Sequence, residues 1–234
     1  MRSIQIRPWS DLKKIDLWQK RVVESLEIWE DNMQVVSTSP LIKTYTLDEF
    51  WALPEPKDGS KFELIAGVLY MTPPPDFPHN FTSSDLVMLF SAHLVKTRDK
   101  CRLFVPRAAL WTGSATYVEP DLFYVSAQTL KNLDWNRPDS ADLVVEVTSP
   151  STAIYDRNTK ADTYAALKVR ELWLVDPDNG TVEVRNLKRV KKGQKGAYGP
   201  GNIFKRGERV KSKVLSKFSP SVDEICSAMP RKSK

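Results

Sequence analysis

The sequence has no run of about 18 consecutive apolar residues, which is the length that a membrane-spanning helix needs. We therefore expect no transmembrane segment and no membrane partner. The N-terminus also lacks the uninterrupted apolar stretch that follows the first charges of a secretory signal. Only two cysteines occur, Cys101 and Cys226, and this number favours reduced thiols in a core over a disulfide framework. Together these absences predict a cytoplasmic protein.

What is present is the composition of a globular protein. Hydrophobic residues make up 41% and charged residues 27% of the 234 residues, which is typical of that class. A chain of this length suits one domain of ordinary size with an appendage. We see no internal repeat and no low-complexity tract.

The chain is basic, with a formal net charge of +6 and a sequence pI near 9.2. Such an excess favours a polyanionic partner, because Lys and Arg contacts to phosphate drive nonspecific binding to nucleic acid. Much of the excess lies in the last third of the chain, where the nucleic-acid-binding candidates are Lys188, Arg189, Lys191 and Lys192. The simpler interpretation of this segment is a solvated loop or strand face.

The first 43 residues are predicted to form an N-terminal helical extension and linker. Ser10 can cap a helix over about residues 11–31, in which apolar residues recur at three- and four-residue steps. This stripe carries no ligand pattern, so we interpret it as a docking or dimerisation helix and expect a homodimer. The rest divides into a main domain over residues 44–228 and a basic tail over residues 229–234.

Turn signals and apolar periodicity predict the elements of the main domain. Thr46 and Glu49 form a capping box before a short helix, and Ala66-Gly67 is a two-residue hairpin signal. Longer helices are expected over about residues 79–96 and 156–168, and strands at 62–65, 68–71, 102–105, 108–111, 121–125, 143–148, 171–175 and 181–185, before a strand pair near 203–215 and a terminal segment at 222–229. This order predicts an α+β or mixed α/β domain whose central sheet is covered by the two longer helices.

Two carboxylates stand where buried strands should least tolerate them. Glu146 follows the apolar run 143–145, and Asp121 opens the apolar run 122–125. A buried acid needs a partner, which a metal ion or a lysine would supply. If the two strands are neighbours, both carboxylates reach the same point and form a divalent-cation site. The alternative is that they are surface or ion-paired carboxylates.

Such a site matches what metal-assisted phosphodiester hydrolysis requires. Carboxylate oxygens hold a hard cation such as Mg²⁺, which polarises the phosphate and lowers the pKa of an attacking water. Lys160, downstream of both acids, can orient that water and offset developing negative charge. Spacing alone does not single out this chemistry, because Asp and Glu near strand ends are common.

Five motifs occur in a fixed order along the chain. They are FELIAG at residues 62–67, PDL at 120–122, VVEVTSPST at 144–152, DRNTK at 156–160 and ELWLVDP at 171–177. In this order they resemble the Uma family of restriction endonucleases, within the PD-(D/E)XK nuclease superfamily. The resemblance spans about residues 45–225 and leaves the first 40 or so uncovered.

The resemblance implies a restriction-endonuclease-like core, with a mixed central sheet and a site at one end of it, and an endonuclease that cuts DNA with Mg²⁺ or Mn²⁺. By position, Asp121 and Glu146 correspond to the two metal-binding acids, and Glu63 to an upstream acid that binds metal directly or through water. The superfamily usually places its lysine two residues after the second acid, where this chain has Thr148. In the Uma family the following helix supplies the lysine, and Lys160 occupies that place.

Other interpretations of these residues stay open. Asp121 can be a turn residue, Glu63 a cross-strand partner of an exposed lysine, and Lys160 a solvated helix residue. His79, at a helix start, can touch phosphate or water, although a lone histidine is more often structural. Asp156 is expected to cap and brace the helix that it begins.

The whole protein also has alternatives to the enzyme. A catalytically inactive nuclease-fold protein would bind nucleic acid or a protein partner through the same surface. A structural partner of another gene product would form a dimer with neither activity. Metal-dependent cleavage that disappears in Glu146→Ala would distinguish the enzyme from both.

Overall fold

The computed structural model describes residues 43–227, with gaps at 99, 135, 190–193 and 216. The predicted helix at residues 11–31 and the basic tail at residues 229–234 therefore lie outside the described residues. The division of the chain into an extension, a main domain and a tail stays a prediction. Among the helices that are described, none combines the length and apolar character needed to cross a membrane.

The described part of the chain opens with the predicted capping box. The Thr46 side chain accepts a hydrogen bond from Glu49 N at 3.2 Å, and the Glu49 carboxylate accepts one from Thr46 N at 2.9 Å. These two bonds satisfy free backbone donors at the start of helix α2 (Leu47–Trp51). The short helix is therefore confirmed at its predicted place.

The predicted hairpin is also confirmed. Strands β1 (Lys61–Ile65) and β2 (Val68–Thr72) pair antiparallel. Between them, Ala66 and Gly67 have φ values of 50° and 82°, the left-handed pair that a two-residue hairpin turn needs. This turn fixes the register of β1, which carries the buried acid Glu63.

The hairpin is half of a four-stranded sheet with the order β2-β1-β5-β4. The other half consists of β4 (Leu110–Thr112) and β5 (Thr116–Val118), which pair antiparallel. Leu64 of β1 pairs with Tyr117 of β5. The predicted strand at residues 108–111 overlaps β4, whereas β5 is not predicted from the sequence.

A larger sheet has six strands in the order β10-β9-β8-β7-β6-β3. Only β7 and β8 are parallel, while the other neighbouring pairs are antiparallel. The bounds are β3 (Arg102–Phe104), β6 (Leu122–Val125), β7 (Leu143–Val147), β8 (Glu171–Asp176), β9 (Thr181–Asn186) and β10 (Asn202–Lys205). The chain thus has the α+β fold with mixed sheets and helices that the sequence predicts.

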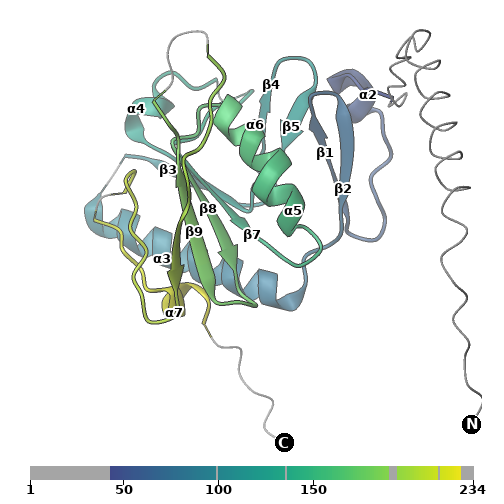
Figure 1. Cartoon of the computed structure of the whole chain (residues 1–234). Helices are drawn as coiled ribbons and strands as arrows, with labels where there is room; N and C mark the ends of the chain where they lie inside the picture. Colours follow the sequence, from purple (N-terminus) through teal and green to yellow (C-terminus); the bar gives the residue numbers. More distant parts are fainter. Residues whose placement is uncertain (1–42, 99, 135, 190–193, 216, 228–234) are drawn as a thin grey trace, which may run out of the picture. The chain divides into compact units, whose positions relative to one another are not determined.

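Helices cover both faces of the large sheet (Figure 1). On one face lies α3 (Phe77–Thr97), which contacts the short α7 (Val222–Ile225). On the other face lies the crossover from β7 to β8. It is one continuous helical segment made of α5 (Ala153–Tyr155), the π-helical turn η1 (Asp156–Lys160) and α6 (Ala161–Ala166). One further short helix, α4 (Ala127–Leu130), follows β6.

Strand β7 is buried on both faces, as its unbroken apolar run predicts. Val145 belongs to the core cluster that contains Leu86 and Phe90 of α3. Its neighbour Val144 belongs to the cluster that contains Tyr164 of α6. Glu146, near the end of β7, therefore lies among residues that are otherwise apolar.

Two predicted elements differ from the structure. The crossover helix spans residues 153–166 with a π-helical turn inside it, rather than residues 156–168. The predicted strand pair near residues 203–215 yields only β10, and Arg209 makes an isolated bridge with Ser221. The reason is local, because the Ser212 side chain accepts hydrogen bonds from Val214 N and Leu215 N and so competes with strand pairing.

Candidate active site

Strand pairing brings the two predicted acids together. In the antiparallel β6–β7 pair, Leu122 lies opposite Val145. Continuing this register by one residue sets Asp121 opposite Glu146, and directly opposite residues of an antiparallel pair share a face. Val147 N donates a hydrogen bond of 2.8 Å to Asp121 Oδ2, which ties the start of β6 to the end of β7.

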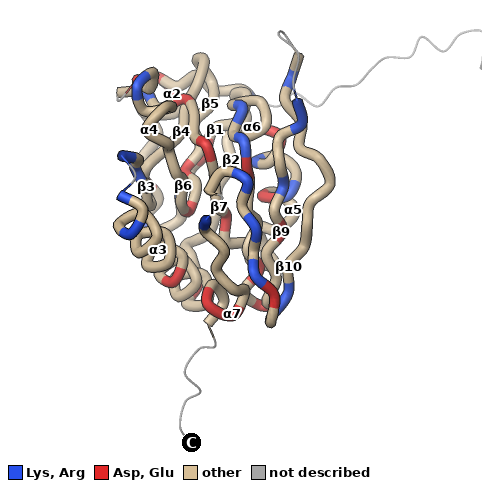
Figure 2. Tube along the Cα trace, turned by 90° about the vertical axis from the view of Figure 1, so that its left-hand side faces the viewer, with Lys and Arg blue, Asp and Glu red and all other residues tan. Residues whose placement is uncertain are grey.

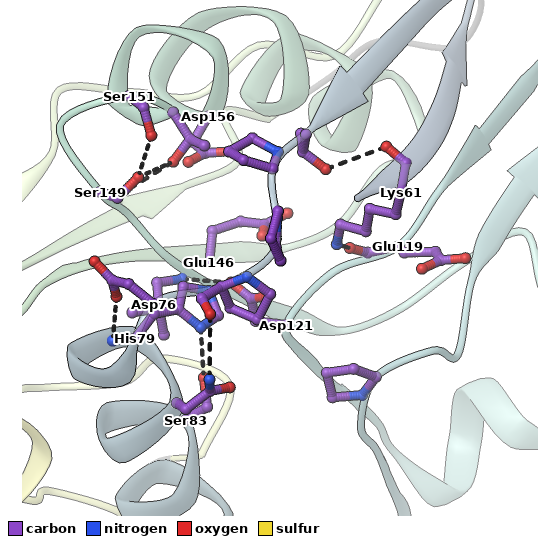
Figure 3. A pocket seen from close by; sticks show the side chains of 18 of the residues that line it. Lys61, Asp76, His79, Ser83, Glu119, Asp121, Glu146, Ser149, Ser151 and Asp156 are labelled. Atoms are coloured by element: carbon purple, nitrogen blue, oxygen red, sulfur yellow. Dashed lines mark hydrogen bonds and ion pairs between the residues drawn. The ribbon is translucent and has the colours of Figure 1, made fainter. Parts of the chain in front are cut away.

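Both carboxylates line one cavity of about 480 Å³ (Figure 3). Its walls come from β1, the start of α3, the ends of β5 and β7, and the π-helical turn. The charged or titratable residues that line it are Lys61, Asp76, His79, Arg107, Glu119, Asp121, Glu146, Asp156 and Lys160. A concave site where several such side chains converge is the usual form of a catalytic centre.

Glu146 is 2% exposed and is held by two donors of the crossover segment. Lys160 Nζ lies 2.6 Å from Glu146 Oε1, and the Tyr164 hydroxyl donates to the same oxygen. Burial raises the pKa of Glu146 to about 8, although the charge of Lys160 opposes the rise. This carboxyl group is therefore protonated far more readily than an exposed glutamate.

Lys160 is also 2% exposed and forms a second ion pair with Glu63 Oε1 at 3.2 Å. Burial alone would lower the pKa of Lys160, but attraction to Glu146 and Glu63 outweighs burial and raises the pKa well above the ordinary value. The ammonium group therefore stays charged between two carboxylates. The interpretation of Lys160 as a solvated helix residue is wrong.

Lys160 lies in the π-helical turn of the crossover segment, so a helix supplies this lysine. Both Asp156 and Lys160 lie in the turn and are buried. Asp156 lies inside the helical segment, which begins at Ala153, so it does not cap the start of this helix as predicted, and burial raises its pKa despite the nearby Lys160. Thr148, at the place where the superfamily usually has its lysine, is buried and donates its hydroxyl to Val175 O at 3.2 Å. Single π-helical turns often occur at functional sites.

Glu63 reaches the site from the smaller sheet. Its Oε1 accepts a hydrogen bond from Glu119 N at 2.8 Å, and its Oε2 accepts one from the Tyr155 hydroxyl at 3.2 Å. Glu63 is fully buried and is absent from the described residues that line the cavity. Glu63 contacts Lys160, which does line the cavity. Its lysine partner is therefore buried, unlike the exposed lysine of the alternative interpretation.

Asp121 is paired with the predicted histidine. His79 Nε2 lies 3.0 Å from Asp121 Oδ2, and Asp76 positions the histidine by accepting from His79 N at 2.9 Å at the start of α3. Burial alone would raise the pKa of Asp121, but the hydrogen bond and charge of His79, together with Lys61 and Lys160, lower it to about 2. Asp121 is therefore ionised near neutral pH.

This region lies within a match to a family model described as "Uma2: Putative restriction endonuclease", which covers residues 47–223. The chain belongs to the Uma2 family. It is also similar to a solved structure from Anabaena variabilis, described as "a putative nuclease belonging to DUF820". That comparison has a TM-score of 0.60 and 21% sequence identity, and it covers 78% of this chain and 98% of the other. At this identity the likeness supports the fold alone. A search among curated proteins found no match.

Sequence reasoning misses several residues of this Uma2 site. Tyr164 follows Lys160 by four positions, and Lys160 follows Asp156 by four, a spacing that puts all three on one helix face. That spacing could have pointed to Tyr164 and Asp156. No sequence signal points to Lys61 or Glu119, because their places in the site depend on how strands far apart in the chain assemble.

The donor chemistry fits a hard divalent cation. Asp121 and Glu146 both offer oxygen atoms to one cavity, and Mg²⁺ usually binds through one or two carboxylates with several waters. In the described part of the chain, no three His, Cys, Asp or Glu side chains are already gathered as a metal site. Lys160 and His79 contact the two acids instead. A cation would therefore bind two carboxylates and water, and would weaken these two contacts.

The two described residues of the predicted nucleic-acid-binding segment do not line this cavity. Lys188 and Arg189 follow β9, are exposed, and are not among the described lining residues. Lys191 and Lys192 lie outside the described residues. Figure 2 shows Lys and Arg at several parts of the chain, including the β9–β10 side and the end near β3. Positive charge in the described part is therefore not confined to the segment after β9.

Proposed function

We propose that this Uma2 family member is a Mg²⁺-dependent endonuclease that hydrolyses DNA phosphodiester bonds, with Mn²⁺ as a second usable ion. The observation that supports it is the meeting of two acids and an amine in one cavity. Asp121 and Glu146 come from adjacent strands, and the buried ammonium group of Lys160 contacts Glu146. The net charge of +6 suits a polyanionic substrate.

Each residue has a defined role in this proposal. Asp121 and Glu146 would hold the cation, which when bound polarises the phosphate and makes a water molecule more acidic. Asp121 is ready for this role because it is ionised, whereas Glu146 must first release any proton that it carries. Lys160 stays charged and stabilises negative charge that develops on the phosphate. Glu63 holds the Lys160 ammonium in place.

A cleavage assay on the full chain tests the proposal. Supercoiled plasmid and branched DNA are incubated with Mg²⁺, Mn²⁺ or EDTA, and we expect cleavage with either ion and none in EDTA. Glu146→Ala should reduce the rate by about 100-fold or more, the scale of losing one preorganised electrostatic group. Asp178→Ala, in the exposed β8–β9 turn, should cleave as the parent chain does. Absence of cleavage with every ion and substrate would refute the proposal.

A second candidate function is a protein that binds nucleic acid without cutting it. The contacts of Lys160 with Glu146 and of His79 with Asp121 favour it, because both acids already have cationic or hydrogen-bonding partners. Equal DNA binding by the parent chain and Glu146→Ala, with no cleavage in any divalent ion, would support this second function.

A further inference from the structure

Four of the described residues that line the cavity can carry a positive charge: Lys61, His79, Arg107 and Lys160. Lys160 is neutralised by two carboxylates, and His79 is paired with Asp121. The other two have no such close acidic partner. The roles proposed above for the two acids and for Lys160 give no function to Lys61 and Arg107.

Lys61 is the first residue of β1 and is half-buried. Its Nζ donates a hydrogen bond of 2.8 Å to the main-chain oxygen of Glu119. That partner is a neutral carbonyl and uses one of the three donors of the ammonium group. Lys61 is nevertheless close enough to the acids to help lower the pKa of Asp121. Its charge and its remaining donors are therefore available to an anion in the cavity.

Arg107 lies in the loop between β3 and β4, and its side chain is 63% exposed. Its Nε is 3.8 Å from Glu119 Oε2, which is too long for a hydrogen bond. Because this distance is too long for a hydrogen bond and the guanidinium group is exposed, its N–H donors can contact a ligand while Arg107 stays beside the buried Glu119 carboxylate.

Glu119 connects these two cations to the rest of the site. It is buried, and its Oε1 accepts from the Tyr117 hydroxyl at 2.8 Å. Within the described residues, Oε2 has no hydrogen-bond partner. The main chain of Glu119 accepts from Lys61 and donates to Glu63. One residue thus holds Lys61 by its carbonyl and attracts Arg107 by its carboxylate.

Lys61 reaches the cavity from the smaller sheet, and Arg107 reaches it from the loop between β3 and β4, where it lies near the same residue, Glu119. Figure 3 shows Lys61 and Glu119 on the side of the cavity across from Ser149, Ser151 and Asp156, with Glu146 between them. Because each phosphate of a DNA backbone is charged, cationic donors on this wall of the cavity strengthen the binding of a backbone that enters it. Lys160 is buried and already contacts two carboxylates, so Lys61 and Arg107 are the cations better placed to bind the backbone.

We propose that Lys61 and Arg107 form a phosphate-binding subsite that holds the DNA backbone against this wall, with Glu119 as the positioning residue for both. The inference rests on the proposed function, since it names residues that bind the substrate of the same site. The two side chains bind non-bridging oxygens of a backbone phosphate and take no part in bond breaking. DNA therefore contacts this cavity wall as well as the basic segment after β9.

Binding without cleavage tests the subsite. The affinity of the full chain for duplex DNA is measured in EDTA over a range of NaCl concentrations. Lys61→Gln and Arg107→Gln should each bind about tenfold more weakly, the scale of one charge-assisted hydrogen bond. Each should also lower the slope of log affinity against log salt by about 1, as expected for one lost phosphate contact. Arg107→Lys should recover part of the affinity.

Two exposed residues provide matched controls. Arg209 is 61% exposed and lies 3.7 Å from Glu224, so it matches Arg107 in exposure and in its distance to an acid, although that acid is exposed, and it is not among the described cavity-lining residues. Lys131 is an exposed lysine after α4. Arg209→Gln and Lys131→Gln should keep the parental affinity and salt slope. If Arg107→Gln binds as Arg209→Gln does, or if the parent chain binds no DNA even at low salt, the subsite is wrong.

The subsite and the nuclease proposal fail in different ways. Weaker binding by Lys61→Gln and Arg107→Gln, with no cleavage by the parent chain in any ion, would support the subsite and refute the nuclease. Cleavage by the parent chain, with unchanged binding by both variants, would do the opposite. If the protein cleaves, both variants should raise KM about tenfold with little change in kcat, because the lost contact exists before and during the chemical step.

Discussion

At the scale of single residues, the Lys160 ammonium offsets part of the negative charge of the acids around it. Lys160 Nζ contacts Glu146 and Glu63, and all three side chains are buried. Removing one partner of a buried ion pair commonly costs about 3–5 kcal/mol, because the other charge is left uncompensated. We expect Lys160→Met to lower the free energy of unfolding by that order in urea denaturation at neutral pH. We also expect it to abolish cleavage.

Two comparisons make this prediction specific. Adding Glu63→Gln to Lys160→Met should recover part of the lost stability, because the buried negative charge that loses its partner is then removed as well. Lys131→Met, at an exposed position, should change the unfolding free energy by less than about 0.5 kcal/mol. If Lys160→Met is no less stable than Lys131→Met, the charge balance inferred from the geometry is wrong.

The raised pKa of Glu146 predicts how stability depends on pH. The folded pKa is about 8 and the ordinary value is 4.5, so between them the folded state binds more protons than the unfolded state. The free energy of unfolding should therefore fall as pH rises through this window. The lowered pKa of Asp121, about 2, has the opposite sign and removes stability only as pH falls below its ordinary value of 3.8.

Glu146→Gln isolates this effect, because glutamine has the same size and does not titrate. Urea denaturation at several pH values between about 5 and 8 should show a falling stability for the parent chain and a much flatter profile for the variant. Identical slopes for the two proteins would show that Glu146 is not the group responsible.

At the scale of elements, helix α3 both covers the large sheet and directs a side chain into the site. Asp76 caps this helix by accepting from His79 N at 2.9 Å, and the ring of the same histidine contacts Asp121. Asp76→Ala should cost about 1 kcal/mol of stability, the usual effect of losing an N-cap. It should also reduce cleavage, because His79 is no longer fixed beside Asp121.

A second helix cap supplies the comparison. Thr46 caps α2 by accepting from Glu49 N, and neither residue is among those that line the cavity. Thr46→Ala should cost a similar amount of stability in thermal or urea denaturation and leave cleavage unchanged. Equal cleavage by the two variants would indicate that the cap of α3 does not position the histidine.

At the scale of the whole molecule, sequence reasoning recovers the parts that carry a local signal. Asp121 and Glu146 can be predicted because an acid beside an apolar strand is costly without a partner. Lys160 is a candidate from its place downstream of both acids, but only the family resemblance distinguishes it from a solvated helix residue. Glu119 and Lys61 cannot be predicted, since their contacts form only when β1, β5 and β6 assemble. The same holds for β5, which pairs with β1 and β4 only when the smaller sheet assembles.

The site exists only where the two sheets meet, and Glu63 makes that connection. Its carboxylate accepts from Glu119 N at 2.8 Å within the smaller sheet region and pairs with Lys160 at 3.2 Å on the crossover segment. Glu63→Gln keeps an oxygen for the backbone donor but removes the charge that holds the ammonium. Because Glu63 does not line the cavity among the described residues, we expect it to act on Lys160 rather than on the cation.

Titration with Mg²⁺ separates the two roles of Glu63. A positioning residue predicts that Glu63→Gln lowers the cleavage rate at saturating Mg²⁺ by about 10- to 100-fold, while the ion concentration for half-maximal rate stays the same. A direct ligand predicts that this concentration rises instead, by a similar factor, with the rate largely restored at saturation. The second outcome would contradict the geometric reading, since it would require the smaller sheet to move Glu63 into the cavity when the ion binds.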